Sequence, residues 1–310
     1  MNKYRVFRSP LNWLVKRTYW PICRMYARLT MHGDKPADRV LNFLCALYFW
    51  KVHGYWPNFK HPRSFSEKVF HRMLFDRDPR WTMVSDKYRV RDYVESILGK
   101  EYLIPLLWKG DNPEEIPFSK LPSSFVIKTN HGCGYNIITK DKSLLNKQKT
   151  VQQLNKWLSE NYSQKYYMGI EWAYKNIMPT VIVESFLEDN GNVPQDFKFF
   201  CYSGRAEFIQ VSFDRFIDAS ERILDRNFKP LELYNGLKLY QGEIVPPSNY
   251  KEMIHVAESL SREFNFMRVD LYNVGERIYV GELTCYHAGG EAIFIPRKYD
   301  YVFGEKWKIN

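Results

Sequence analysis

Two carboxylates and an arginine late in the chain are of the residue types that bind magnesium and phosphate. Arg268 and Asp270 lie in the segment MRVDLY, and Glu282 follows in YVGELT. Magnesium takes one or two carboxylates and completes its octahedron with water and phosphate oxygens. The segments are typical of a hairpin around residues 273–276, in which a three-residue loop or a bulge would place both carboxylates on one face. An exposed hairpin with alternating charges is the simpler alternative, although a carboxylate inside an apolar strand is costly without a partner.

A lysine followed by a glycine-bearing loop is a second candidate for phosphate binding. Lys128 ends the apolar run FVIK, and the loop TNHGCGYN follows with His131, Gly132 and Gly134. Cations and backbone N–H groups bind phosphate, and glycines let the backbone approach it closely. The segment matches neither a P-loop nor the GxGxxG pattern. A plain hairpin turn is therefore the alternative interpretation.

Four more charged residues lie within or beside apolar runs. Glu184 ends VIVE, where a strand edge could bind adenine, and a salt-bridged glutamate is the alternative. Lys198, between two phenylalanines, could bind phosphate or extend along the surface to water. Arg215 and Arg222 could clamp the γ-phosphate or an acidic substrate.

The elements that must position these residues can be predicted from local patterns. Two helices are expected within residues 64–98, the first capped by Ser64 and Glu67 and the second ended by Gly99. Further helices are expected at 147–160 and 250–264. Runs rich in β-branched and aromatic residues predict strands at 102–108, 124–130, 136–141, 181–187, 196–203, 205–214, 266–274 and 277–284. This pattern indicates an α+β protein whose late strands are mostly antiparallel.

Composition excludes several classes of protein. The chain has 310 residues with a net charge of +10, which favours anionic partners. Its five cysteines form no CxxC pair and no zinc spacing, so a reducing compartment is expected. No nucleic-acid-binding module, GxSxG motif, signal peptide or membrane-spanning run is visible, so we expect a cytoplasmic protein that does not bind nucleic acid.

Residues 1–60 differ from the rest of the chain because arginine, lysine and large aromatic residues are interleaved there. The apolar positions recur at helical spacing, so a basic helical extension is predicted. A helical pair packed on the main domain is one interpretation. Peripheral contact with anionic lipid at the inner face of the cytoplasmic membrane is the other.

Six segments taken in order resemble one family: SDKYRVRDYV, FVIKTNHGCGYNII, VIVESFLED, DFKFFCYSG, MRVDLYNV and YVGELT. They are similar to the TupA-like group of ATP-grasp proteins, which are encoded with bacterial surface-polysaccharide genes and often labelled glycosyltransferases. The resemblance spans about residues 60–290. It implies an ATP-grasp fold, in which two α+β subdomains clamp ATP. The implied division is an extension at 1–60 and a catalytic domain at 61–310, with a lid subdomain at about 124–183.

The resemblance also implies ATP and Mg²⁺ as cofactors and assigns roles by position. The residues that would contact ATP are Lys87, Lys128, the lid loop with His131, Gly132 and Gly134, the adenine hinge Glu184, Ser185, Phe186 and Leu187, and the ribose acid Asp196. The metal ligands would be Asp270, Glu282 and Thr284, the last standing where many superfamily members have asparagine. By resemblance, Arg268 would be the arginine that stabilises the transferring phosphate. From the sequence alone, Arg215, Arg222 and Lys198 are further candidate catalytic cations. The candidates for contact with the acceptor are Arg215, Arg222, Arg268 and His287.

The implied reaction is the ATP-dependent joining of a carboxylate to an amine through an acyl phosphate. For this group we expect an amino acid or amine to be joined to a uronic acid of a capsular or other cell-surface polysaccharide, with an acceptor that could be lipid-linked. A sugar kinase on the same fold and a glycosyltransferase remain alternatives, although no DxD motif is visible. A basic binding protein without activity is a further alternative.

Overall fold

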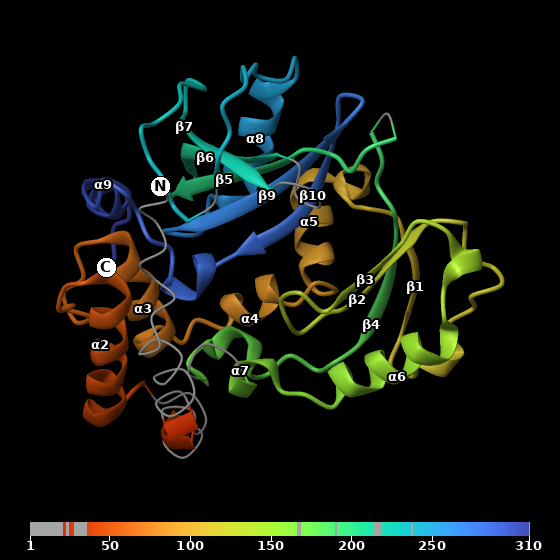
Figure 1. Ribbon diagram of the computed structural model, residues 1–310, viewed down its shortest axis with the longest axis horizontal. Helices are drawn as coiled ribbons and strands as arrows, with labels where there is room; N and C mark the ends of the chain where they lie inside the picture. Colours follow the sequence, from red (N-terminus) through yellow and green to blue (C-terminus); the bar gives the residue numbers. More distant parts are fainter. Residues whose placement is uncertain are drawn as a thin grey trace, which may run out of the picture.

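Two separate antiparallel sheets organise the molecule (Figure 1). The computed structural model describes residues 21–22, 25–27, 36–165, 169–189, 191–213, 219–236 and 238–309. Within these residues a four-stranded sheet has the order β1-β4-β2-β3, and a six-stranded sheet has the order β10-β9-β5-β6-β7-β8. The short pair β7 and β8 runs parallel, whereas the other described pairs are antiparallel.

The strands of each sheet come from different parts of the chain. The smaller sheet contains β1 (Leu106–Gly110), β2 (Phe125–Thr129), β3 (Asn136–Thr139) and β4 (Val181–Ser185). The larger sheet contains β5 (Asp196–Tyr202), β6 (Arg205–Phe213), β7 (Ser220–Asp225), β8 (Lys238–Leu239), β9 (Met267–Val274) and β10 (Arg277–Thr284). The eight predicted strands are all present, and β7 and β8 are additional.

Helices cover both sheets and fill the space between them. They are α2 (Arg39–His53), α3 (Phe65–Phe75), α4 (Arg80–Ser85), α5 (Val90–Leu98), α6 (Lys147–Leu158), α7 (Tyr162–Lys165), α8 (Tyr250–Ser261) and α9 (Lys298–Lys306). In Figure 1, α6 lies along the smaller sheet, and α4 and α5 lie between the two sheets. The 3-10 turns η6 (Trp172–Tyr174) and η7 (His287–Gly290) lie near α4 and α3 respectively.

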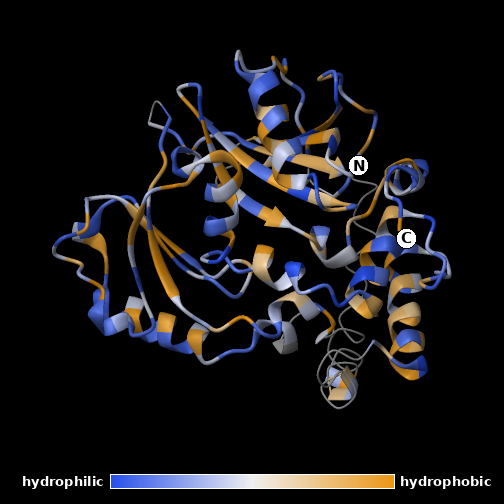
Figure 2. Ribbon diagram, turned by 180° about the vertical axis from the view of Figure 1, so that it is seen from behind, coloured by the Kyte–Doolittle hydropathy of each residue, from blue (hydrophilic) through white to orange (hydrophobic). Residues whose placement is uncertain are grey.

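Each sheet has its own apolar core. Val151 and Leu154 of α6 pack on Ile127 and Val183 of the smaller sheet. A larger aromatic-rich core joins α3, α8 and α9 to the six-stranded sheet, and Phe65 at the start of α3 is almost fully buried in it. Figure 2 shows apolar residues along the strands of both sheets, whereas the helices alternate between apolar and polar turns. Two cores of this kind allow two subdomains on either side of a shared cleft.

The predicted capping box at the start of α3 is confirmed. The Ser64 side chain accepts a hydrogen bond from the Glu67 N–H at 3.1 Å, and the Glu67 carboxylate accepts from the Ser64 N–H at 2.9 Å. The same carboxylate also accepts from the N–H groups of Asn58 and Arg63. This buried glutamate therefore fixes the chain that leads into α3.

The second helix predicted within residues 64–98 is broken into α4 and α5. The break lies at Asp86, whose carboxylate accepts hydrogen bonds from the Tyr88 and Arg89 N–H groups at 2.9 and 3.1 Å. It also accepts from the Asn130 side-chain amide at 2.9 Å. A carboxylate that takes backbone donors in this way competes with the helix. The break leaves Lys87 beside the loop after β2.

Half of the basic N-terminal segment, residues 1–60, lies outside the described residues. Helix α2 is described, and it begins at the N-cap Asp38 and ends at Gly54 with φ of 75°. Tyr48 in α2 donates to the Glu291 carboxylate at 2.5 Å, which ties the helix to the segment after β10. Within the described part of the chain, no helix is both long and apolar enough to cross a membrane.

Candidate active site

Asp270 and Glu282 lie on neighbouring strands and face the same side of the six-stranded sheet. Strands β9 and β10 are joined by a two-residue turn at Gly275 and Glu276, both with positive φ. An even-numbered turn alone would place Glu282 on the far face. The register shifts at Gly281, however, so that Glu282 pairs with Asp270. The bulge thus brings the two predicted metal ligands together.

Arg268 binds Asp270 at two points. Its Nε and Nη2 donate to the two carboxylate oxygens, each at 2.7 Å. It also donates to Thr284 Oγ1 at 3.0 Å and to His287 Nδ1 at 2.9 Å, and it lies 4.0 Å from the Glu282 carboxylate. Because arginine can only donate, His287 Nδ1 accepts. Burial and the Arg268 charge hold the pKa of His287 well below its usual value, so the ring is neutral.

Lys198 extends the charged face onto the next strand. It lies directly opposite Asp270 in β5 and donates to Asp196 on the same strand. Burial raises the pKa of Asp270, and the adjacent Arg268 and Lys198 cations oppose this shift. Alternate residues of a strand share a face, so Asp196 lies on it too. On β5 and β9 this face therefore carries Asp196 and Asp270, each bound to a cation of the protein, and Glu282 lies beside Asp270 on β10.

The smaller sheet supplies a second set of charges. Glu184 at the end of β4 accepts from Lys128 Nζ at 2.7 Å and from Arg91 Nη1 at 2.9 Å. Arg91 also donates to the Ile104 carbonyl at 3.0 Å, which fixes its guanidinium. The Glu184 side chain is only 7% exposed. In this structure its carboxylate is therefore bound by two cations.

One small cavity, of about 30 Å³, lies between charged residues of the smaller sheet and Glu282 of the larger sheet. It is lined by Lys87, Lys128 and Glu184 on one side and by Glu282 and its neighbour Leu283 on the other. The first group comes from the helix break and the smaller sheet, and the second from β10 of the larger sheet. Residues separated by almost 200 positions in the sequence thus border one space. Lys87 and Lys128 are of a residue type that binds phosphate, and Glu282 opposite them is of a type that binds magnesium.

The loop between β2 and β3 is fixed from within. His131 is buried, and its Nε2 lies 3.0 and 3.1 Å from two carbonyl oxygens at the end of α6. The carbonyl of Gly132 accepts from Lys87 Nζ, and a Cβ there would lie 2.6 Å from the Tyr162 ring. Gly134 has φ of 74° and open space around it. Close packing thus accounts for Gly132, whereas Gly134 is exposed at the loop tip.

The structure does not bring Arg222, one of the predicted catalytic cations, to this site. Arg222 follows Glu221 in β7, and the register places it on the face opposite Lys198 and Asp270. Its guanidinium lies 3.7 Å from the Glu232 carboxylate. Successive residues of a strand point to opposite faces of the sheet. Arg222 therefore points away from the face that carries Lys198 and Asp270. Arg215 falls outside the described residues.

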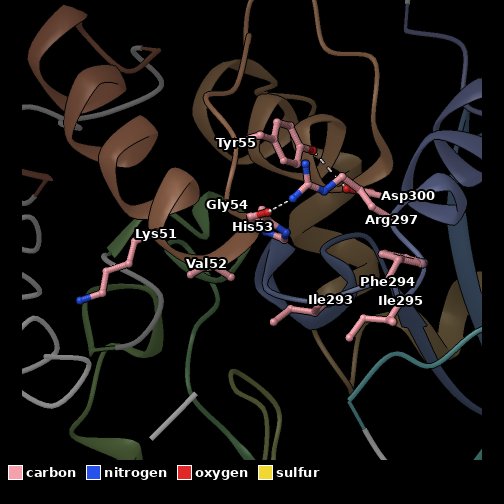
Figure 3. Close-up of a pocket in the computed structure, with 10 residues that line it drawn as sticks. All are labelled: Lys51, Val52, His53, Gly54, Tyr55, Ile293, Phe294, Ile295, Arg297 and Asp300. Carbon is pink, nitrogen blue, oxygen red and sulfur yellow. Dashed lines mark hydrogen bonds between the residues drawn. The ribbon is translucent and has the colours of Figure 1, made fainter. Parts of the chain in front are cut away.

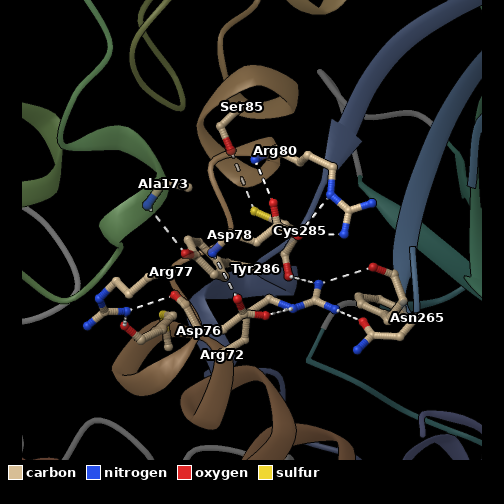
Figure 4. A network of polar contacts seen from close by, with 12 residues as sticks. Arg72, Asp76, Arg77, Asp78, Arg80, Ser85, Ala173, Asn265, Cys285 and Tyr286 are labelled. Atoms are coloured by element: carbon tan, nitrogen blue, oxygen red, sulfur yellow. Dashed lines mark hydrogen bonds and ion pairs between the residues drawn. The ribbon is translucent and has the colours of Figure 1, made fainter. Parts of the chain in front are cut away.

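A polar network behind β10 supports the site (Figure 4). Arg72 of α3 donates to the carbonyls of Phe266 and Cys285, each at 3.1 Å, and to the Asn265 side chain at 2.5 Å. These acceptors lie just before β9 and just after β10. Arg72 therefore holds the ends of the two strands that carry the carboxylates.

A family model described as TupA-like ATPgrasp matches residues 67–308. The chain belongs to the TupA-like ATP-grasp family. The match covers both sheets and every residue that lines the cavity. The predicted α+β, ATP-grasp fold is thereby confirmed.

Solved structures with a similar fold are distant in sequence. D-alanine–D-alanine ligase from Bacillus anthracis, complexed with ATP, is 15% identical, with a TM-score of 0.38 over 66% of this chain and 54% of that one. The ATP-grasp ligase PsnB, complexed with a precursor variant, Mg and ADP, is 14% identical, with a TM-score of 0.39 over 74% and 61%. The L-amino acid ligase from Bacillus licheniformis is 14% identical, with a TM-score of 0.39 over 67% and 44%.

The chain spans less than two thirds of the length of these three ligases. The family match therefore carries the assignment. No curated protein matches the sequence.

The predicted adenine hinge, Glu184–Leu187, begins at the end of β4 and runs on toward β5. The Ser185 N–H donates to the Pro105 carbonyl at 3.0 Å, at the end of β4. Phe186 and Leu187 follow, and both are half-buried in the segment that leads to β5. The hinge is thus the covalent connection between the smaller and larger sheets.

Two residues near the site were missed in the sequence. Arg91 lies four positions after Lys87, a spacing that places both residues on one face of an unbroken helix. Glu171 precedes η6 and is buried beside the site. No periodic or motif signal marks Glu171, because it lies in an irregular segment.

Proposed function

We propose that this enzyme uses ATP to form an amide between an amino acid or amine and a uronic acid of a capsular or other cell-surface polysaccharide. The carboxylate would be activated as an acyl phosphate, with ADP released, and the amine would displace the phosphate. The observation that carries the proposal is the single cavity between Lys87, Lys128 and Glu184 on one wall and Glu282 on the other. One wall of the cavity has lysines, which are of the type that binds phosphate, and the other has Glu282, a carboxylate of the type that binds magnesium.

The residues present fit ATP and Mg²⁺. Lys87 and Lys128 would contact the phosphates, the segment Glu184–Leu187 the adenine, and Asp196 the ribose. Asp270 and Glu282 would bind Mg²⁺, with Thr284 at the third position. No cluster of three metal-ligating side chains occurs among the described residues, but Mg²⁺ needs only one or two carboxylates when phosphate and water complete its shell. When bound, Mg²⁺ neutralises charge on the transferring phosphate.

Charge is the main obstacle that this chain must overcome. A carboxylate and the γ-phosphate repel each other, so their approach requires fixed cations in a site that excludes water. Arg268 and Lys198 supply such cations on the larger sheet, and their ion pairs with Asp270 and Asp196 hold them in place. The following attack by the amine depends mainly on positioning.

The net charge of +10 supports an anionic acceptor. A saccharide on a lipid carrier would suit the basic and aromatic segment 1–60, which we propose as a peripheral membrane contact. Sedimentation with anionic liposomes at low salt tests this point. If the full chain stays in the supernatant, the membrane contact is wrong.

Trapping the acyl phosphate tests the function. The full chain would be incubated with ATP, Mg²⁺, hydroxylamine and a panel of uronic acids and uronate oligosaccharides. We expect a hydroxamate and an equal amount of ADP, both lost in Asp270→Asn. Glu305→Gln, a surface substitution on α9, is the matched control.

Other outcomes would contradict the proposal. A stable phosphorylated sugar without hydroxamate would indicate a kinase. Stabilisation against thermal unfolding by a nucleotide-sugar, with none by ATP, would indicate a glycosyltransferase, because only a ligand that binds the native state raises the midpoint.

A further inference from the structure

Glu171 is a buried glutamate without a cation in the described part of the chain. Glu171 is 3% exposed, and its Oε2 has no hydrogen-bond partner. Other buried carboxylates of the site are bound by cations of the protein: Asp270 by Arg268, Asp196 by Lys198, and Glu184 by Lys128 and Arg91. A buried carboxylate is costly without such a partner.

Packing places Glu171 at the back of the phosphate site. The Ala173 N–H, two residues on, donates to the Tyr286 hydroxyl at 3.3 Å, directly after the strand that carries Glu282. Tyr174 packs on the Tyr162 ring at 4.9 Å between centroids. Tyr162 in turn touches the loop after β2. The segment is therefore held between the phosphate loop and the segment after β10.

The electrostatic surroundings agree with this placement. Burial, followed by the negative charges of Glu291 and Glu282, raises the pKa of Glu171 to about 8. Glu171, Glu282, Lys87 and Arg268 all act on the pKa of Cys133 in the phosphate loop. Glu171 therefore lies in the electrostatic surroundings of Glu282 and the phosphate loop, and a cation bound beside it would favour its ionised form.

We propose that Glu171 recognises the amine co-substrate and binds its ammonium group beside the activated carboxylate, an inference that rests on the proposed ligase function. The two substrates carry opposite charges, so different residues attract them. A uronate carboxylate is attracted to Arg268 and Lys198, whereas an ammonium is attracted to an unpaired carboxylate. An ammonium bound at Glu171 would give this carboxylate a charge-assisted hydrogen bond and a counter-ion.

Thermal unfolding of the full chain with Mg²⁺ and ADP measures ammonium binding without knowledge of the natural amine. The probes are ethylammonium chloride and tetramethylammonium chloride at equal ionic strength, because both are cations but only ethylammonium can donate hydrogen bonds. We expect ethylammonium to raise the midpoint more than tetramethylammonium does. Glu171→Gln should abolish this difference and keep the shift caused by ADP.

A second assay separates recognition from folding. Uncharged hydroxylamine needs no ammonium site, so Glu171→Gln should form hydroxamate at a rate within about threefold of wild type. Coupling of ethylamine to the same uronate should fall by at least about tenfold, through a higher KM for the amine. Glu171→Asp should restore part of this coupling.

The outcomes distinguish the two proposals. Absence of hydroxamate from the wild type would overturn the proposed function, whatever Glu171 does. Hydroxamate formation with an ethylammonium preference that persists in Glu171→Gln would overturn the role of Glu171 alone. Loss of the ADP shift in Glu171→Gln would also overturn it, because the residue would then support the fold.

Discussion

Asp270 in β9 pairs with Glu282 in β10 only because the extra residue Gly281 shifts the register of β10 by one position. A Cβ at Gly281 would lie 2.8 Å from the Tyr272 ring and 3.3 Å from the Asp270 carbonyl oxygen. The bulge therefore needs a residue without a side chain. The geometry of this proposed metal-binding pair depends on the glycine as much as on the carboxylates themselves.

Gly281→Ala should therefore weaken the metal site. The added methyl group must displace the ring or the strand, at a cost of about 1–3 kcal/mol. We expect the Mg²⁺-dependent part of the ATP-induced rise in midpoint to fall, while the part that persists with a chelator stays unchanged. If Mg²⁺ contributes as much in the variant as in wild type, the bulge does not position the carboxylates.

Lys128→Ala should weaken nucleotide binding. The ammonium is lost from the wall of the cavity, and Glu184 is left with Arg91 as its partner. Removal of one charge-assisted phosphate contact should reduce ATP affinity by roughly 10-fold or more. Lys140→Ala, an exposed lysine after β3, is the matched control. Calorimetric titration of both variants measures the difference, and equal affinities would remove Lys128 from the site.

Arg72→Met should destabilise the protein by about 3–5 kcal/mol, because three buried acceptors lose their donor. The Arg72 guanidinium also stacks 4.2 Å from the Trp81 ring and 4.3 Å from the Trp307 ring. Arg80, near it in Figure 4, pairs with Asp78 at the surface. Urea unfolding of Arg80→Met should show a loss below about 1 kcal/mol. Similar losses for the two variants would contradict a special role for Arg72.

Local patterns in the sequence were sufficient for most of the fold. The capping box at Ser64 and the strands that carry Lys128 and Asp270 were predictable, because each depends on neighbouring residues. The sequence could allow the bulge but could not require it, since the register is fixed only when β9 also pairs with β5.

Features that depend on distant partners could not be predicted. The helix break at Asp86 needs the Asn130 amide, 44 residues away in the chain. The face of the sheet on which Arg222 lies follows from the register of β5, β6 and β7. The alternation of apolar and polar residues in β7 is weak. Glu171 acquires its surroundings entirely from tertiary packing.

His53 should make the protein sensitive to mild acid. Its Nε2 lies 2.9 Å from the Gly290 carbonyl oxygen, and the Arg297 guanidinium donates to the His53 carbonyl at 3.2 Å (Figure 3). Burial lowers the pKa of His53 to about 4, and Arg297 adds to this shift. His53 therefore binds a proton near pH 6.5 in the unfolded chain, but only near pH 4 in the folded protein.

The sign of the effect follows from this difference in proton binding. The free energy of unfolding should fall as pH decreases from about 6.5 to 4, by up to about 3 kcal/mol from this residue. His53→Gln removes the titration and keeps a polar side chain. His131 and His287, whose pKa values are also lowered, remain in both proteins. Urea unfolding at a series of pH values should therefore show a shallower acid loss for the variant, and identical slopes would exclude His53 as its source.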